Sequence, residues 1–390
     1  MSRTYLDHAA TTPMLPVAVE AMSRELARVG NASSLHGAGR AARRVVEESR
    51  ERIAACLRAQ PAEVIFTAGG TESDNLAVKG SFWAARAADP ARRRVVTSTV
   101  EHHAVLDSVS WLARHEDAEI SLLEVDAQGR IDLAELARLG HGTEVATVSV
   151  IWANNEVGAV QPIRQVAAWA ASVGACSHSD AVQAVGHLPV DFAGSGLDLL
   201  TLTAHKLGGP YGIGALLARR ETPLTAVLHG GGQERDVRSG TLDVPAIAGF
   251  AAAVEHATAT LAGEAERLRG LRAQLLDGLR AVAVDAVTNG PAAPDCLPGI
   301  VSVSFPDCDA DALLMLLDRA GIDSSTGSAC SAGLSQPSHV LTAMGRSEAA
   351  ARSTLRFSLG HSSTAADIAA LLDALPEALR RARLAGRLSG

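Results

Sequence analysis

Short apolar runs alternate with longer stretches of helical periodicity over the middle of the chain. The apolar runs cover residues 63–67, 94–99, 120–125, 146–151, 198–203 and 213–218. Strands that are separated by helices need crossover connections, so they lie mainly parallel in one sheet with helices on both faces. The pattern therefore predicts an α/β fold built on a mainly parallel sheet.

A different pattern follows a long alanine- and leucine-rich helix that we expect over residues 251–284. After it come a strand (299–305), a helix (310–320), a loop of small residues, another helix, a strand (354–359) and a terminal helix. This order predicts a smaller α+β domain. Because 390 residues exceed the usual size of a single core, two domains are expected.

The charge and the cysteine content argue against several classes of protein. A net charge of −8 argues against a nucleic-acid-binding face. The five cysteines form no C-x-x-C pair, so neither a disulfide framework nor a zinc site is expected. No apolar run is expected to span a membrane, and the first residues lack the layout of a signal peptide. We therefore expect a cytoplasmic protein with no direct nucleic-acid, membrane or metal partner.

Lysine is scarce, because Lys79 and Lys206 are the only lysines among the 35 lysine and arginine residues. Arginine keeps its proton near neutral pH and cannot act as an amine nucleophile. Lys79 falls on an expected helix surface. Lys206 follows an apolar run and precedes a glycine-rich turn, a place that suits a desolvated amine able to form a Schiff base. A surface lysine is an equally open interpretation of Lys206.

The turn at residues 69–73, Gly-Gly-Thr-Glu-Ser, lies between an expected strand and an expected helix. Backbone N–H groups, the Thr71 hydroxyl and the helix dipole would form an anion cradle there. The turn has neither a G-x-G-x-x-G pattern nor a P-loop lysine, so dinucleotide and nucleoside triphosphate binding lose support. A simple helix cap is an equally open interpretation.

Asp180 follows a short expected strand, and ligands of open α/β sheets bind at such carboxyl ends. A carboxylate at this position could fix the positive charge of a heteroaromatic nitrogen, as the protonated pyridine of pyridoxal phosphate requires. A helix N-cap is the structural alternative. Asp180 and Lys206 are 26 residues apart, which is one crossover unit, so they could meet from neighbouring strands.

Four further side chains are candidates for the same site. His102 begins a helix after a strand and could stack on a flat cofactor or move protons, and Asn155 follows another strand. Cys330 stands among small residues, so we expect an exposed thiol that is either a nucleophile or an incidental loop cysteine. Arg356 lies in an expected strand, where a buried guanidinium would bind a substrate carboxylate at two points.

These features occur together in one known family. The chain resembles the pyridoxal-phosphate-dependent cysteine desulfurases of fold type I, in the class-V aminotransferase group, which serve iron–sulfur cluster assembly and tRNA thiolation. The matching stretches are YLDHAATT (5–12), NASSLH (31–36), FTAGGTESDN (66–75), EHHAV (101–105), NNEVG (154–158), DAVQ (180–183), HK (205–206), GGGQER (230–235), RSGT (238–241), GSAC (327–330) and RFSLG (356–360). With this resemblance we expect a large cofactor-binding domain over residues 13–255 and a small domain formed by residues 1–12 and 256–390.

The resemblance implies a role for each matching position. Lys206 would be the Schiff-base lysine, Asp180 the partner of the pyridine nitrogen, and Gln183 the partner of the ring hydroxyl. His102 would stack on the ring and take the proton of the substrate thiol. The phosphate would be bound by Gly70, Thr71, Thr203 and His205, and by Thr241 from the second subunit of a homodimer. Arg356 and Asn155 would bind the substrate, and Asn155 would also contact the cofactor.

The implied reaction converts L-cysteine to L-alanine. Lys206 would remove the Cα proton, and the Cys330 thiolate would attack the substrate sulfur and become a persulfide. The sulfur would then pass to an acceptor protein, either an iron–sulfur scaffold or a tRNA-thiolating enzyme. The small-residue form of residues 324–337 is typical of family members that transfer sulfur to scaffold proteins.

Three positions depart from the commonest family pattern and leave this reaction intact: His8 for asparagine, Gly70 for alanine and Thr203 for serine. Selenocysteine lyase and another aminotransferase of the group are the alternative enzymes, and a sulfur-relay or assembly-platform protein is the non-enzymatic alternative. Dependence on Cys330 and the choice between cysteine and selenocysteine would separate them.

Overall fold

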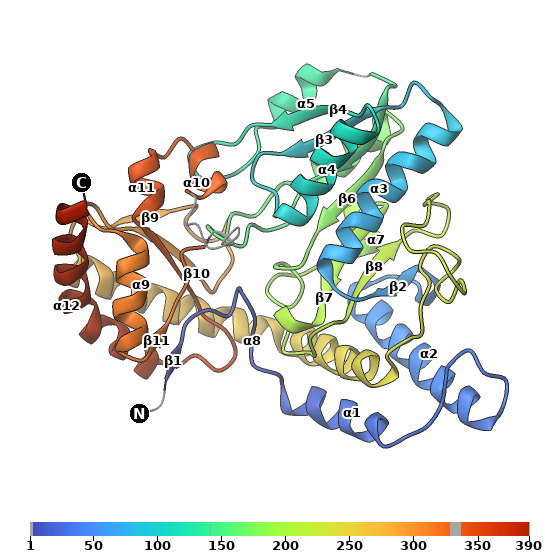
Figure 1. Ribbon diagram of the computed structural model, residues 1–390, viewed down its shortest axis with the longest axis horizontal. Helices are drawn as coiled ribbons and strands as arrows, with labels where there is room; N and C mark the ends of the chain where they lie inside the picture. Colours follow the sequence, from blue (N-terminus) through green and yellow to red (C-terminus); the bar gives the residue numbers. More distant parts are fainter. Residues whose placement is uncertain (1–2, 141, 328–336, 390) are drawn as a thin grey trace.

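The computed structural model describes residues 3–140, 142–327 and 337–389. Its largest sheet has seven strands in the order β2–β8–β7–β6–β5–β3–β4 (Figure 1). These strands are β2 (Val64–Thr67), β3 (Arg94–Ser98), β4 (Glu119–Leu123), β5 (Val145–Ser149), β6 (Cys176–Asp180), β7 (Leu199–Thr203) and β8 (Gly214–Ala218). β8 runs antiparallel to both of its neighbours and every other neighbouring pair is parallel, which confirms the predicted mainly parallel sheet.

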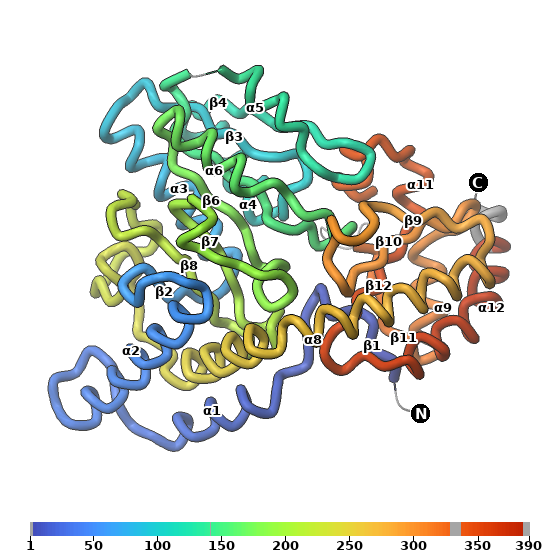
Figure 2. The backbone as a smooth tube through the Cα atoms, turned by 180° about the vertical axis from the view of Figure 1, so that it is seen from behind, coloured from blue at the N-terminus to red at the C-terminus, as the bar shows by residue number. Residues whose placement is uncertain are grey.

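Helices cover both faces of this sheet, because successive residues of a strand point to opposite sides. On β8, Leu216 belongs to a cluster with Leu76 of α3 (Gly70–Ala88). Leu217 belongs to the main core cluster with residues of α2 (Gly37–Leu57) and α8 (Val244–Val282). α4 (His103–His115) lies beside α3, α6 (Ile163–Ser172) packs on β5 and β6, and α1 (Pro16–Leu26) packs on α8 (Figures 1 and 2). The remaining short elements are η1 (Pro61–Glu63), α5 (Leu133–Leu139), α7 (Phe192–Ser195) and η2 (Ala204–Lys206).

The helix α8 joins the large sheet to a second group of elements (Figure 2). Its first turns pack in the main core, whereas Leu271, Leu275 and Leu279 near its end pack in a separate cluster. The helix begins at Val244, not near residue 251 as predicted, because Asp243 accepts a hydrogen bond from the Ala246 N–H at 3.0 Å and caps it. One stretch of α8 is long and apolar enough to cross a membrane by composition, and 56% of it is buried inside the protein. Packing in a core accounts for that composition.

The second group of elements contains two small sheets. β12 (Thr354–Ser358), β10 (Ile300–Ser304) and β9 (Val287–Asn289) form an antiparallel sheet, and β1 (Thr4–Tyr5) pairs in parallel with β11 (Ile322–Asp323). α9 (Ala310–Arg319), α10 (His339–Ala343), α11 (Glu348–Arg352) and α12 (Ala365–Ser389) complete the group. The predicted change from a parallel to an α+β pattern after the long helix is therefore confirmed, whereas the domain boundary at 255/256 stays a prediction.

The N-terminal segment crosses between the two groups of elements (Figure 1). β1 belongs to the second group, yet the Thr12 N–H donates at 3.1 Å to the carbonyl of His205, two residues after the end of β7 in the large sheet. The segment 7–12 consequently passes over the carboxyl ends of the large-sheet strands, where the sequence predicts the site.

Candidate active site

A cavity of about 350 Å³ opens at the carboxyl ends of the large-sheet strands. The predicted residues that line it are Gly70, Thr71, His102, Asn155, Asp180, Gln183, Thr203, His205, Lys206 and Arg356. Thr241 is missing from the described part of the lining, and its exposed side chain lies in the segment before α8. Cys330 lies outside the described residues.

Lys206 is held at the end of the short helix η2, directly after β7. Its Nζ donates hydrogen bonds to the carbonyls of Ala9 at 2.6 Å and Ala10 at 2.7 Å. Burial, followed by the nearby Arg356 charge, lowers the pKa of Lys206 to about 8. A substantial share of this amine is consequently neutral near physiological pH, which the interpretation as an amine nucleophile requires.

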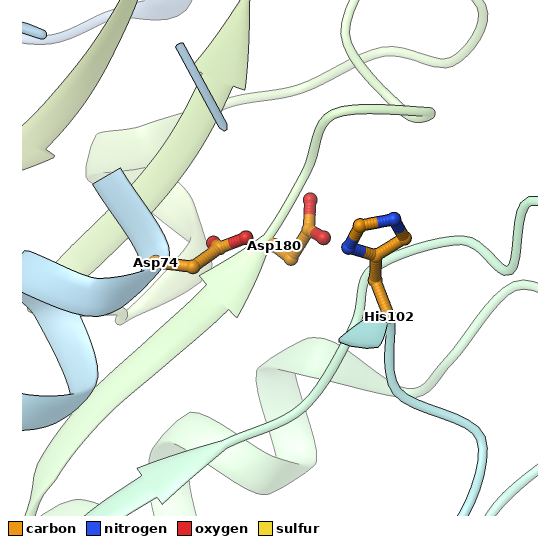
Figure 3. Close-up of side chains that lie close together, drawn as sticks. All are labelled: Asp74, His102 and Asp180. Atoms are coloured by element: carbon orange, nitrogen blue, oxygen red, sulfur yellow. The ribbon is translucent and has the colours of Figure 1, made fainter. Parts of the chain in front are cut away.

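Asp180 ends β6, which pairs in parallel with β7, so Asp180 and Lys206 do come from neighbouring strands. The carboxyl group accepts the Val182 N–H at 2.9 Å and is buried. Burial raises the pKa of Asp180, whereas His102 and Lys206 lower it. Figure 3 shows the Asp180 carboxyl between Asp74, on α3, and the ring of His102. A desolvated carboxylate that faces the cavity is suited to bind a cationic ring nitrogen.

His102 is the N-cap of α4, and its Nδ1 accepts the Ala104 N–H at 3.1 Å. A neutral ring therefore carries its proton on Nε2, and the Nδ1 lone pair is already occupied. Burial lowers the pKa of His102 while Asp180 raises it. Stacking needs only the ring, whereas the predicted general-base role needs the ring to exchange its bond with Ala104 for one with the substrate. The helix cap, which is the structural alternative, is thus present alongside the predicted roles.

The glycine-rich turn forms the start of α3 and opens onto the cavity. Gly69, with φ of 152°, precedes the helix, and a Cβ on Gly70 would lie only 3.0 Å from Cγ2 of Val182. Side chains of Thr71, Thr203 and His205 surround this helix N-terminus. Burial lowers the pKa of His205 to about 4, so its ring is neutral and can donate to an anion. Helix N–H groups and neutral donors of this kind suit a phosphate group.

Arg356 lies in β12 and is buried at the edge of the cavity. Its Nη1 donates to the Asn155 carbonyl at 2.9 Å, and its Nη2 donates to Oδ1 of Asp7 at 2.7 Å. The buried Nε has no hydrogen-bond partner among the described residues. The sequence predicted the buried arginine and its position but not the aspartate that already pairs with it.

Two further acidic residues and one histidine belong to this site and were assigned no role from the sequence. Asp74 and His339 line the cavity, Glu101 is fully buried, and Nε2 of His339 donates to the Glu101 carbonyl at 2.9 Å. Asp74 stands one helical turn after Thr71, a spacing that could have placed it on the cavity side of α3. His339 belongs to a distant part of the chain, and no local pattern points to it.

The residues present fit pyridoxal phosphate. A phosphate suits the helix N-terminus at Gly70, a protonated pyridine nitrogen suits the buried Asp180 carboxyl, and an aldehyde suits the desolvated amine of Lys206. Asp74, His102 and Asp180 also offer ligand atoms within 4.8 Å of one another, as some metal sites do. Because all three side chains line the same cavity as Lys206, we assign the cluster to the cofactor pocket.

The chain is similar to known proteins over most of its length. The class-V aminotransferase family model matches residues 4–371. A Mycobacterium tuberculosis protein described as an IscS-like cysteine desulfurase is 55% identical over 382 residues, which cover 98% of this chain and 97% of that protein. A solved structure of a NifS-like protein has a TM-score of 0.89 at 33% identity and covers 97% of this chain and 100% of its own. A structure of SspA in complex with cysteine has a TM-score of 0.78 at 32% identity and covers 92% of this chain and 99% of its own.

Proposed function

This chain belongs to the class-V aminotransferase family and is a cysteine desulfurase, and we propose that it converts L-cysteine to L-alanine and leaves the sulfur as a persulfide on Cys330. The observation that carries the proposal is the meeting of Lys206, Asp180 and Arg356 in one cavity. An amine, a buried carboxyl and a buried guanidinium are what a pyridoxal-phosphate enzyme needs to hold the cofactor and an amino-acid carboxylate.

We propose that pyridoxal phosphate is held by Lys206, Asp180, Gln183, Thr203, His205 and the turn at Gly70 and Thr71. The cofactor supplies an electron sink for the carbanion that forms when the substrate loses its Cα proton. Lys206 takes that proton, because its low pKa leaves a neutral amine. Arg356 and Asn155 orient the substrate carboxylate, and His102 stacks on the ring and handles the thiol proton. The Cys330 thiolate forms the new S–S bond as the Cβ–S bond of the substrate breaks, and the electron pair of that bond stays with Cβ, which takes up a proton to become the methyl group of L-alanine.

The protein is proposed to act as a homodimer in which Thr241 completes the phosphate site of the second subunit. Exposed apolar side chains support this proposal: Leu26, Val29 and Leu35 are 63%, 90% and 89% exposed. Leu26 and Val29 line a groove together with Leu242, the neighbour of Thr241. Monomeric proteins rarely expose apolar patches of this kind.

The sulfur acceptors are proposed to be an iron–sulfur scaffold or a tRNA-thiolating enzyme. Support comes from the small-residue sequence around Cys330 and from the high identity to an IscS-like relative. The cytoplasmic location expected from the sequence stays a prediction.

The decisive experiment measures L-alanine and sulfide released from L-cysteine in the presence of a reductant. The wild-type protein should release both in equal amounts. Cys330→Ala should release neither while it still binds pyridoxal phosphate, and Lys206→Ala should be inactive without covalently held cofactor. Cys56→Ala and Lys79→Ala are the matched controls and should behave as wild type. Full activity of Cys330→Ala would exclude the persulfide and favour a selenocysteine lyase or an aminotransferase.

A further inference from the structure

Arg356 is already neutralised by a carboxylate of the same chain. The Nη2 of Arg356 donates to Oδ1 of Asp7 at 2.7 Å, and the two side chains are 5% and 21% exposed. Asp7 lies between β1 and the segment that binds Lys206, and it forms a parallel bridge with Ser358, two residues after Arg356 on β12. The ion pair therefore sits where the N-terminal segment, β12 and the cavity meet.

Within the described residues, the pairing leaves the Nε–H and the second N–H of each terminal nitrogen for a ligand. Nη1 is bound by the Asn155 carbonyl and Nη2 by Asp7, whereas the buried Nε has no partner among the residues that the structure describes. A ligand carboxylate that reaches Arg356 must therefore approach an arginine whose charge Asp7 has compensated. Repulsion between two carboxylates in a poorly solvated site opposes binding unless the ligand brings a positive charge.

An amino acid brings such a charge in its ammonium group. The amine of Lys206 marks where that group enters, because the substrate nitrogen takes the place of the lysine nitrogen in enzymes of this class. Asp7 and Asp180 are the charged groups that raise the pKa of Lys206, which means that both attract a cation at this point. Arg356 opposes them, and the neighbouring His205 ring is neutral.

We propose that Asp7 is a specificity-determining residue, which makes the carboxylate position at Arg356 accept zwitterionic amino acids and reject carboxylates that lack an amino group. This inference rests on the proposed substrate role of Arg356. It assigns to Asp7 a function that a purely structural anchor of the N-terminal segment would not have. A structural anchor would affect the binding of all ligands alike. The Asp7 carboxylate beside Arg356 would instead weaken the binding of negatively charged ligands more than that of zwitterionic ones.

L-Alanine and propionate differ only in the amino group, and neither carries sulfur, so both can be titrated into the holoenzyme without turnover. Asp7→Asn keeps the shape and the acceptor oxygen but removes the charge. We expect this variant to bind propionate about tenfold more tightly than wild type while L-alanine binding changes much less. Asp7→Glu retains the charge and should restore the wild-type preference for L-alanine, which also controls for misfolding of the asparagine variant.

Calorimetric titration of these variants tests the specificity role of Asp7 separately from the proposed substrate role of Arg356. If Asp7→Asn leaves the ratio of the two dissociation constants unchanged, or weakens both ligands equally, Asp7 only anchors the segment and the specificity proposal is wrong. Arg356→Gln serves as the separate arm for the site itself. If that variant binds L-alanine as tightly as wild type, Arg356 is not the carboxylate position, and the proposed substrate role fails together with the inference.

Discussion

The carboxyl groups of Asp74 and Asp180 lie side by side in the interior, with oxygen atoms within 4.8 Å of each other (Figure 3). Both side chains are almost fully buried, at 1% and 4% exposure. Two carboxylates in such a site cannot both be ionised at little cost. Asp180 faces His102 and Lys206, whereas Oδ1 of Asp74 has no hydrogen-bond partner in the described part of the chain. Asp74 is therefore the group that keeps its proton.

This arrangement predicts how Asp74→Asn changes stability with pH. Burial and the neighbouring Asp180 raise the pKa of Asp74 well above its ordinary value of 3.8. As the pH rises above that value, the unfolded chain loses this proton and the folded protein keeps it, so wild type loses stability. The variant avoids this loss. The free energy of unfolding of Asp74→Asn minus that of wild type should therefore increase by up to about 1.4 kcal/mol for each pH unit above pH 4.

Urea unfolding of the cofactor-free proteins between pH 4 and pH 8 measures the difference. Asp126→Asn, at an exposed turn, is the control and should run parallel to wild type at every pH. A constant difference between Asp74→Asn and wild type would mean that Asp74 is ionised in the folded protein. A variant that loses stability relative to wild type as the pH rises would contradict the assignment outright.

The low pKa of Lys206 predicts the pH dependence of cofactor capture. Covalent capture of pyridoxal phosphate needs the neutral amine, and burial together with Arg356 lowers the pKa of Lys206 from 10.5 to about 8. The rate at which the cofactor-free protein takes up pyridoxal phosphate should rise about tenfold per pH unit below pH 8 and level off above it. Stopped-flow absorbance between pH 6 and pH 9.5 gives this profile.

Lys79→Ala is the matched control for this experiment, because Lys79 is the second lysine of the chain and its amine lies 4.7 Å from the centre of the Trp111 ring. It should reproduce the wild-type profile, and Lys206→Ala should form no adduct that borohydride can fix. A rate that still rises about tenfold per pH unit between pH 8 and pH 9.5 would show that the Lys206 amine titrates like a free lysine.

Local sequence patterns were sufficient where the site depends on strand order. Asp180 follows a short expected strand and Lys206 follows an apolar run, the two residues are one crossover unit apart, and parallel neighbours bring their carboxyl ends to one edge of the sheet. The end of β6 and the turn at Gly70 were predicted for the same reason. The start of α8 was missed although the local signal existed, since Asp243 followed by Pro245 is a typical helix start.

The ion pair between Asp7 and Arg356 could not be predicted in this way. The two residues are 349 positions apart, Asp7 in the segment after β1 and Arg356 in β12. Neither the turn around Asp7 nor the strand around Arg356 carries a pattern that selects the other as its partner. A buried arginine predicts some carboxylate, and the sequence could assign that carboxylate only to a substrate. The contact depends on the tertiary packing of β1, β11 and β12, which local periodicity does not determine.

The apolar surface around α1 predicts the oligomeric state. Val29 and Leu35 are almost fully exposed, and a carboxylate on either would be placed in any interface that covers them. Val29→Asp combined with Leu35→Asp should convert a dimer to monomers in sedimentation analysis and weaken retention of pyridoxal phosphate, because Thr241 would no longer reach the second site. Met315→Asp on α9 alters another exposed apolar residue and should leave the dimer intact. A dimer that survives the double substitution would exclude this surface.

A buried ion pair outside the cavity predicts a large effect on stability. Arg50 and Glu234 bond at two points, at 2.8 and 2.7 Å, and Glu234 also accepts the Phe66 N–H of β2 at 2.8 Å. The Arg50 and Glu234 side chains are 10% and 2% exposed. Glu234→Gln leaves the buried Arg50 guanidinium with only the half-exposed Glu47, at 3.2 Å from Nε, as a charge partner, so the free energy of unfolding should fall by about 3 kcal/mol.

Glu255→Gln provides the matched control, because it removes the partner of Arg52, two residues further along the same helix α2, in a pair whose side chains are 38% and 44% exposed. Exposed pairs of this kind contribute about 0–1 kcal/mol, so chemical denaturation should separate the two variants clearly. An equal decrease in the free energy of unfolding of the two variants would mean that water reaches Arg50 and that the segment around Glu234 does not pack against β2. Both variants should turn over cysteine at the wild-type rate per folded molecule, because neither ion pair touches the cavity.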